Sequence, residues 1–424
     1  MRLWLVALLL LVPFSFALII ENTGRAGENP VIYGDTIVYE RAGVIYAYDI
    51  AKRYEKELSR GSNPSIFGFI AAFETRETDV DLNGDGDYDD VVIRFANVRD
   101  GKVASTNSIG HNPFVWSKLI VFSTNEAELG VDFSNDGDMA DDIIRQYDID
   151  KKETVNLKAV GDFPVVNQHA LLFVTDESQV STDLNLDGDK SDNVLRVLDR
   201  ESRKVSNEKI SAGRIVLTKT GKAVFSSDGE IVFFDAIEQK NERTGQNGIS
   251  PSLFDNVIVF ERDGELYGYS LRNRNLAKLN LRGKSPSLFE NRLAFVTSES
   301  DVGDLNNNGD TNDVIVRFAK EEDIDGDDVF DFSDNCQGVI NEGQEDFNNN
   351  GIGDACDNEK PKQEEKKSES PPSAVQNAGE TPAESAGIPW YWYVVGILLL
   401  PFVLYFSVKY GYRYYKKRKK SFGF

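Results

Sequence analysis

An apolar strand introduced by proline recurs along the chain and constrains the fold more than any other feature. It reads NPVIYG, NPSIFG, NPFVW, FPVV, SPSLF and SPSLF, with the prolines at positions 30, 64, 113, 164, 251 and 286. The spacings are therefore 34, 49, 51, 87 and 35 residues. A proline-free unit around RIVL (214–217) divides the longest gap, so the sequence predicts seven repeats.

Each repeat continues with a β-branched and aromatic strand, such as TIVYE or LIVFS, and then another, such as VIYAYD or VIVRF. The alternation and the turn residues between segments favour strands over helices throughout. A polar fourth segment ends most repeats near a glycine: Gly61, Gly110, Gly161, Gly213, Gly248 or Gly283. One repeat is thus a four-stranded antiparallel meander. Seven such sheets arranged radially give an all-β fold, a seven-bladed β-propeller over residues 18–322.

The seventh repeat lacks a fourth strand, because an acidic loop follows VIVRFA (314–319). Residues 18–20 precede Gly27 and Pro30 much as a fourth strand precedes Gly283. We therefore expect the N-terminal strand to close the ring, which leaves only short strand edges unpaired. The alternative is an open solenoid of the same repeats, which leaves the missing fourth strand unexplained.

The strand pattern over about residues 18–320 resembles seven-bladed propellers built from TolB-like or WD40-like repeats. No Trp-Asp dipeptide ends the repeats, so the resemblance implies an architecture and no particular partner.

Four repeats expand the turn between their second and third strands, whereas repeats one, five and six turn tightly. Aligned on their glycines, the expanded turns place oxygen-bearing side chains at alternate positions and once more three residues later. The four sets are Asp81, Asn83, Asp85, Asp87 and Asp90; Asp132, Ser134, Asp136, Asp138 and Asp141; Asp183, Asn185, Asp187, Asp189 and Asp192; and Asp304, Asn306, Asn308, Asp310 and Asp313. Alternate oxygens around a sharp glycine bend suit a hard cation with six to eight ligands, as in the first half of an EF-hand loop.

The expanded turns also resemble the calcium loops of FG-GAP-type propellers. The final glutamate of an EF-hand is absent, and we expect Asp90, Asp141, Asp192 and Asp313 to replace it. Calcium fits better than magnesium or zinc, because the ligands are numerous, all oxygen and carried by loops. The alternative is four solvated polar turns without metal, which does not explain why all four keep one register.

Residues 323–357 resemble a thrombospondin type 3 repeat. The matching positions are Asp323, Asp325, Asp327, Asp331, Asp334, Asp346, Asn348, Asn350, Asp354 and Asp357. The resemblance implies two calcium ions and a wrapped segment with almost no core, although the family's proline after the first cysteine is Gln337 here.

The only two cysteines, Cys336 and Cys356, lie in this segment of a chain that we expect to be exported, so a disulfide is expected. The alternative is a zinc site or a catalytic thiol. Neither histidine, His111 or His169, lies nearby in the sequence, which argues against zinc.

Hydrophobic segments outside the repeats indicate the location of the protein. Residues 1–17 have the charge, apolar run and small residues of a signal peptide. Residues 358–387 are polar and rich in Pro, Glu, Lys and Ser, which is typical of a flexible linker. Residues 388–408 carry no charge and predict a transmembrane helix, and the basic residues of 409–424 place that tail in the cytoplasm. We expect a single-pass protein of the cell membrane with its N-terminal part outside.

The net charge of −23 excludes a nucleic-acid partner, because an acidic surface repels phosphate. With no catalytic motif such as GxSxG, the sequence favours a calcium-binding surface protein that binds an extracellular protein or glycan without catalysis. One alternative is a carbohydrate-active hydrolase or lyase, which paired carboxylates in the central channel would favour. The other is an accessory subunit of a membrane complex.

Overall fold

The computed structural model of the chain describes residues 18–321, 329, 331, 334–336, 338–348 and 352–357. The predicted signal peptide (1–17), linker (358–387), transmembrane helix (388–408) and cytoplasmic tail (409–424) lie outside the described residues, as do Asp323, Asp325, Asp327 and Asn350. Within the described part, none of the helices has the length and hydrophobicity that a membrane span requires.

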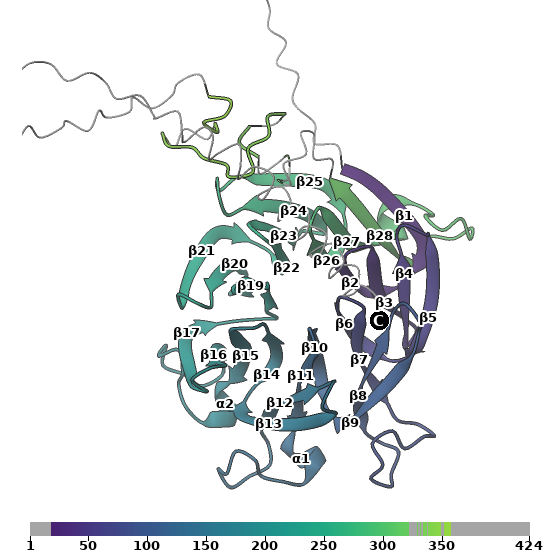
Figure 1. Ribbon diagram of the computed structural model, residues 1–424, viewed down its shortest axis with the longest axis vertical. Helices are drawn as coiled ribbons and strands as arrows, with labels where there is room; N and C mark the ends of the chain where they lie inside the picture. Colours follow the sequence, from purple (N-terminus) through teal and green to yellow (C-terminus); the bar gives the residue numbers. More distant parts are fainter. Residues whose placement is uncertain are drawn as a thin grey trace, which may run out of the picture. The chain divides into compact units, whose positions relative to one another are not determined.

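Seven antiparallel sheets of four strands surround a central axis (Figure 1), which confirms the predicted seven-bladed propeller. Blade 1 holds β2 (Glu28–Tyr33), β3 (Thr36–Arg41), β4 (Val44–Asp49) and β5 (Tyr54–Arg60); blade 2 holds β6 (Ser62–Phe67), β7 (Ile70–Arg76), β8 (Val91–Asn97) and β9 (Val103–Ile109); blade 3 holds β10 (His111–Trp116), β11 (Leu119–Asn125), β12 (Asp142–Asp148) and β13 (Glu153–Val160); blade 4 holds β14 (Asp162–Val166), β15 (Ala170–Asp176), β16 (Asn193–Asp199) and β17 (Val205–Ser211). Blade 5 holds β18 (Val216–Leu217), β19 (Lys222–Ser227), β20 (Glu230–Asp235) and β21 (Lys240–Asn247); blade 6 holds β22 (Ile249–Phe254), β23 (Val257–Arg262), β24 (Glu265–Ser270) and β25 (Leu276–Arg282); blade 7 holds β26 (Lys284–Phe289), β27 (Arg292–Ser298), β28 (Val314–Glu321) and β1 (Leu18–Ala26).

Blade 7 is built from both ends of the propeller sequence. Strand β1 pairs with β28 in a register that runs from Leu18 opposite Glu321 to Ala26 opposite Ile315, with an irregularity between Asn22 and Arg25. The N-terminal strand therefore closes the ring as predicted, and the open solenoid is wrong.

Three one-turn helices are the part of the repeat region that the sequence reading missed. They are α1 (Glu126–Leu129), α2 (Glu177–Val180) and α3 (Glu299–Val302), and each begins directly after the second strand of its blade. Asn125 and Asp176 cap the first two, because their side chains accept the backbone N–H two residues further on. A single turn is too short to show a helical period, which is why strands alone were expected.

The core lies between adjacent blades, where the central residues of the second strand of each blade are buried. Phe122 of β11 has no exposed surface and packs against Gly110 at the start of blade 3. A Cβ atom on Gly110 would lie 2.4 Å from a ring carbon of Phe122, so no larger residue fits there. The recurring glycine at the repeat junctions is thus a packing requirement.

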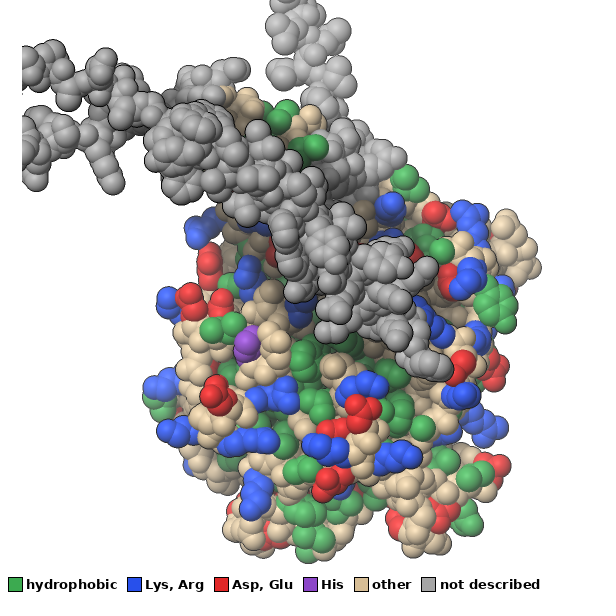
Figure 2. Space-filling view, in the orientation of Figure 1, with side chains coloured by type: hydrophobic (Ala, Val, Ile, Leu, Met, Phe, Trp, Pro, Cys, Tyr) green, Lys and Arg blue, Asp and Glu red, His purple; other side chains and the backbone are tan. Residues whose placement is uncertain are grey.

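The antiparallel order of the strands gives the propeller two distinct faces. We call loop face the side that carries the connections between second and third strands and between blades, and turn face the opposite side. The four long loops (77–90, 126–141, 177–192 and 299–313) carry 7, 6, 5 and 5 acidic residues and one base, Lys190. Figure 2 shows one side of the molecule, where lysine and arginine side chains surround a hollow lined by hydrophobic side chains.

Candidate metal centres

Each long loop is pinned at its base by a backbone hydrogen bond between a glutamate and an aspartate. The N–H of Glu77 donates to the carbonyl oxygen of Asp90 at 2.8 Å. The equivalent pairs, all at 2.9 Å, are Glu126 and Asp141, Glu177 and Asp192, and Glu299 and Asp313. The last predicted ligand of every loop is therefore held directly beside a glutamate that the sequence reading did not include.

The first aspartate of each loop shapes the turn. In blade 2, the two carboxylate oxygens of Asp81 accept the backbone N–H groups of Gly84 at 2.5 Å and Gly86 at 3.1 Å. Gly86 has a φ of +105°, a conformation that residues with a Cβ avoid. Asp132, Asp183 and Asp304 accept in the same way from Gly137, Gly188 and Gly309 at 3.1, 3.1 and 3.0 Å.

In three of the loops, the asparagine that is the second predicted ligand contacts the aspartate that is the last one. The Nδ2 atom of Asn83 donates to Oδ2 of Asp90 at 2.7 Å. Asn185 and Asp192 make the same contact at 2.6 Å, and Asn306 and Asp313 at 2.7 Å. In blade 3, the hydroxyl of Ser134 instead donates to Asp132 at 3.2 Å. The second and last predicted ligands are therefore in contact in three loops, whereas the middle aspartates, such as Asp85 and Asp87, are exposed.

Each long loop begins at a buried glutamate. Glu77 is 2% exposed, and Glu126, Glu177 and Glu299 are 0% exposed. Oε1 of Glu126 accepts the backbone N–H groups of Phe133 at 2.5 Å and Ser134 at 2.6 Å, and the other three glutamates make the same pair of contacts in their own loops. One oxygen of each glutamate therefore fixes the path of the loop backbone.

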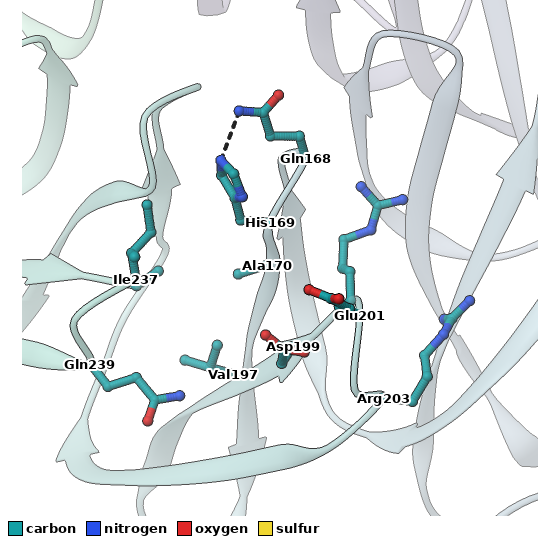
Figure 3. A pocket seen from close by; sticks show the side chains of 11 residues that line it. Gln168, His169, Ala170, Val197, Asp199, Glu201, Arg203, Ile237 and Gln239 are labelled. Atoms are coloured by element: carbon teal, nitrogen blue, oxygen red, sulfur yellow. Dashed lines mark hydrogen bonds between the residues drawn. The ribbon is translucent and has the colours of Figure 1, made fainter.

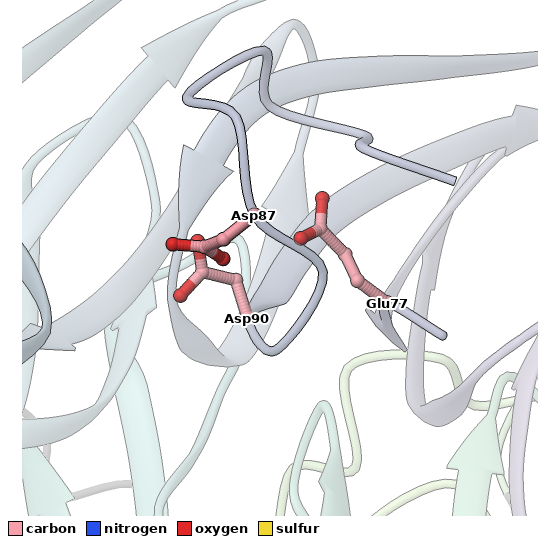
Figure 4. A group of neighbouring side chains, drawn as sticks. All are labelled: Glu77, Asp87 and Asp90. Carbon is pink, nitrogen blue, oxygen red and sulfur yellow. The ribbon is translucent and has the colours of Figure 1, made fainter. Parts of the chain in front are cut away.

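Three of these glutamates also lie close to aspartates of their own loops. Glu77, Asp87 and Asp90 each offer a carboxylate oxygen within 4.8 Å of the others (Figure 4). Three further groups meet the same limit: Asp136, Asp138 and Asp141; Glu177, Asp189 and Asp192; and Glu299, Asp310 and Asp313. Oε2 of Glu77 and Oε2 of Glu126 are buried and accept no hydrogen bond within the described part of the chain. Such an oxygen is costly to bury unless a cation binds it.

The crowding of carboxylates changes their acidity. Burial, together with the neighbouring Asp85 carboxylate, raises the pKa of Asp90 to about 6 despite the hydrogen bond from Asn83. Burial also raises the pKa of Asp141 to about 6, with Asp136 adding to the effect. A divalent cation in the same place would reverse this repulsion.

A sequence signal for the missed glutamates does exist. The second strands of the four blades with long loops end in FETRE, FSTNE, FVTDE and FVTSE, a pattern F-x-T-x-E that blades 1, 5 and 6 lack. The threonine is buried and its hydroxyl donates to a backbone carbonyl of the preceding blade, for example Thr124 to Ile109 at 2.7 Å. Counted from the first aspartate, the glutamate lies four to six residues upstream, and this variable spacing hides it.

The described residues of the 323–357 segment include its disulfide. Cys336 and Cys356 are bonded, with Cα atoms 5.5 Å apart, which confirms that prediction and rules out the free-thiol alternative. Nδ2 of Asn348 donates to Asp357 at 2.8 Å, and Asp354 accepts the N–H of Phe347 at 3.2 Å. Asp331, Asp334 and Asp357 are buried, and Asp346 lies in the same segment.

Carboxylates near the loop-face end of the central channel hold the blades together. Glu40 accepts the N–H of Asn63 in the next blade at 3.3 Å, and Glu74 accepts that of Asn112 at 2.7 Å. Asp162 accepts Nδ2 of Asn112 at 2.9 Å. These carboxylates accept hydrogen bonds from backbone and amide groups of neighbouring blades.

No protein-family model and no curated protein matches this chain. Among solved structures, it is similar to an oligogalacturonate lyase in complex with manganese, at 10% identity and a TM-score of 0.44 over 68% of this chain and 85% of that one. It is also similar to the oligogalacturonate lyase from Vibrio parahaemolyticus, at 10% identity and a TM-score of 0.45 over 72% of this chain and 91% of that one. The match to TolB from Acinetobacter baumannii has 14% identity and a TM-score of 0.38 over 62% of each chain. These likenesses carry no inference about the activity of this chain.

Proposed function

We propose that the four long loops each bind one calcium ion, and that Glu77, Glu126, Glu177 and Glu299 take part in its binding. The observation that carries the proposal is the buried Oε2 of Glu77, which has no hydrogen-bond partner among the described residues and belongs to a carboxylate that forms one group with Asp87 and Asp90. Oε2 of Glu126 is likewise buried without such a partner. An all-oxygen, many-membered site of this kind suits a hard cation, and calcium tolerates the irregular geometry of loops better than magnesium.

The role that this proposal supports is non-enzymatic binding at a cell surface. Calcium would turn four acidic loops into a rigid rim on the loop face, which then presents a fixed surface to an extracellular protein or glycan. Because β28 starts at the loop face and runs to the turn face, the chain leaves the propeller on the side away from the loops. An anchor after residue 357, as the sequence predicts, would then leave the loop face free.

The test is a comparison of Glu77→Gln with Asp79→Asn in the full chain. Asp79 lies in the same loop but its side chain is 79% exposed and outside the acidic groups, so it is a matched control. We expect Glu77→Gln to lose about one bound calcium ion, counted by equilibrium dialysis with elemental analysis, while Asp79→Asn keeps them all. Unchanged calcium binding by Glu77→Gln would contradict the proposal.

A second measurement separates a ligand from a structural role. In chelator, Glu77→Gln should melt at the same temperature as the wild type or higher, because it removes a buried negative charge whose Oε2 has no hydrogen-bond partner among the described residues, while Oε1 can still accept the N–H groups of Leu82 and Asn83. In calcium, it should melt lower. A variant that is equally destabilised in both conditions would show that the glutamate serves the fold alone. Turnover of glycans or peptides that is abolished by these loop substitutions would overturn the non-enzymatic role.

A further inference from the structure

A pocket of about 420 Å³ lies between blades 4 and 5 on the turn face, opposite the metal loops (Figure 3). Three turns form it, those that follow β14, β16 and β20. Its volume is in the range of small-molecule sites. The pocket shares no residue with the candidate metal centres, so what it binds is a question separate from calcium.

The pocket combines an apolar floor with polar walls. Ala170, Val197, Ala236 and Ile237 supply the apolar side chains, and Ile237 is 59% exposed. The polar side chains are Gln168, His169, Asp199, Arg200, Glu201, Arg203 and Gln239. The same cavity thus offers a surface for carbon-bound hydrogens and groups that donate or accept hydrogen bonds.

The charges of the pocket balance, since its lining contains two arginines, Arg200 and Arg203, and two carboxylates, Asp199 and Glu201. The carboxylate of Asp199 accepts the backbone N–H of Ser202 at 2.6 Å, and the guanidinium of Arg200 donates to the carbonyl oxygen of Asn167 at 2.5 Å. Glu201 and Arg203 are exposed and make no ion pair or side-chain hydrogen bond with the described residues. A polyanion would be repelled by the acids and a polycation by the arginines, which leaves a neutral, hydroxyl-rich ligand as the best match.

Aromatic rings extend from one side of the pocket around the turn-face end of the channel. Trp116, Phe67, Tyr33, Phe289 and Phe254 follow one another on five blades, with centroid distances of 6.0, 5.0, 4.3 and 5.2 Å. Each ends the inner strand of its blade.

The arc of rings is interrupted at blades 4 and 5, where Asn167 and Thr218 hold the equivalent positions and bond to each other at 3.0 Å. The pocket opens beside this polar gap. Arg200 links the two features, because it lines the pocket and its guanidinium carbon lies 6.0 Å from the centre of the Trp116 ring.

We propose that this pocket binds a neutral saccharide of one or two sugar units. A sugar ring has an apolar face, which fits the floor at Ile237, and hydroxyl groups that both donate and accept, which fit Glu201, Arg203 and Gln168. The site lies on the face opposite the metal loops, so it adds a ligand-binding function to the proposed calcium-dependent one and does not depend on it.

The test uses the purified full chain in detergent and a panel of glucose, galactose, mannose, N-acetylglucosamine and their disaccharides, followed by saturation-transfer NMR and calorimetry. We expect at least one of these sugars to bind. Arg203→Ala and Glu201→Gln, at exposed positions whose loss leaves the core intact, should each weaken binding about tenfold or more. Lys219→Ala, on the same face but outside the pocket, should bind as the wild type does.

The outcome in chelator and the outcomes that would contradict the proposal are as follows. Binding that persists in chelator supports a site separate from calcium, and it would do so even if the calcium proposal failed. No binding by any sugar of the panel, unchanged affinity in both pocket variants, or binding by uronic acids alone would overturn the proposal.

Discussion

Glu77 and Asp90 are linked at the base of the first long loop, where the N–H of Glu77 donates to the carbonyl oxygen of Asp90 at 2.8 Å. Their carboxylates also belong to one group with Asp87. The backbone contact ends the strand ladder, so the carboxylates are placed by the sheet itself. A flexible loop thereby gains at least two acidic groups of fixed position. This arrangement explains how a rigid blade can present a preformed part of a metal site while the rest of the loop adapts to the ion.

Calcium removal is expected to lower the melting temperature of the propeller. A ligand that binds only the folded state at 100 times its Kd adds about 2.7 kcal/mol per site. The measurement is scanning calorimetry of the full chain in calcium, in excess chelator and in magnesium. An identical melting temperature in calcium and chelator would show that the loops do not couple metal binding to folding.

Gly110→Ala should destabilise the propeller by about 1 to 3 kcal/mol, because its Cβ would lie 2.4 Å from the ring of Phe122 and 2.8 Å from a backbone oxygen. Gly213→Ala is the matched control at the same junction of blade 5, where the nearest atom is the side-chain oxygen of Ser226 at 3.1 Å. Urea unfolding at fixed calcium concentration gives both values. Equal effects of the two substitutions would contradict the packing argument.

His111→Gln should cost stability at low pH only. The hydrogen bond from its imidazole to Glu128, with Glu74 and Asp162 nearby, raises the pKa of His111 above its ordinary value. The stabilisation by the charged ring is therefore fully present below about pH 6.5 and is lost as the pH rises through the higher pKa of the folded state. Melting temperatures of wild type and variant should differ at pH 5.5 and converge at pH 8.5, whereas a constant difference would indicate a packing role.

Asn22→Ala should weaken calcium binding by one loop only. The side chain of Asn22 in the closing strand β1 donates to the carbonyl oxygen of Leu305 in the loop of blade 7. Loss of such a hydrogen bond lowers the stability of the loop by about 1 kcal/mol, which weakens calcium affinity about fivefold if the bond stabilises the calcium-bound loop. Calcium titration should show one weakened site. Ile19→Ala, at an exposed position of the same strand, should leave all sites unchanged.

The sequence determines the propeller to the level of single strands, because each blade repeats the same apolar alternation and the same junction glycine. The N-terminal closure also follows from the sequence, since residues 18–20 stand where a fourth strand is missing. The one-turn helices escape such a reading, because a cap such as Asn125 acts over only two residues.

The candidate metal site was predictable in its loop residues and not in its buried glutamates. Asp87 and Asp90 are part of a spacing that can be read along the chain. Glu77 directly follows strand β7, ahead of the aspartate spacing, and only its backbone hydrogen bond to Asp90 brings it into the group. The pocket is harder to predict from the sequence, because its lining residues Gln168, Glu201 and Gln239 come from three turns that share no motif.

The mixed origin of blade 7 has a consequence for biosynthesis. Strand β1 (Leu18–Ala26) is made first and its partner β28 (Val314–Glu321) last. At ribosomal speeds of 5–20 residues per second, roughly 15 to 60 s separate the two. Throughout that interval β1 has no partner strand, and the seventh blade can form only after translation of β28.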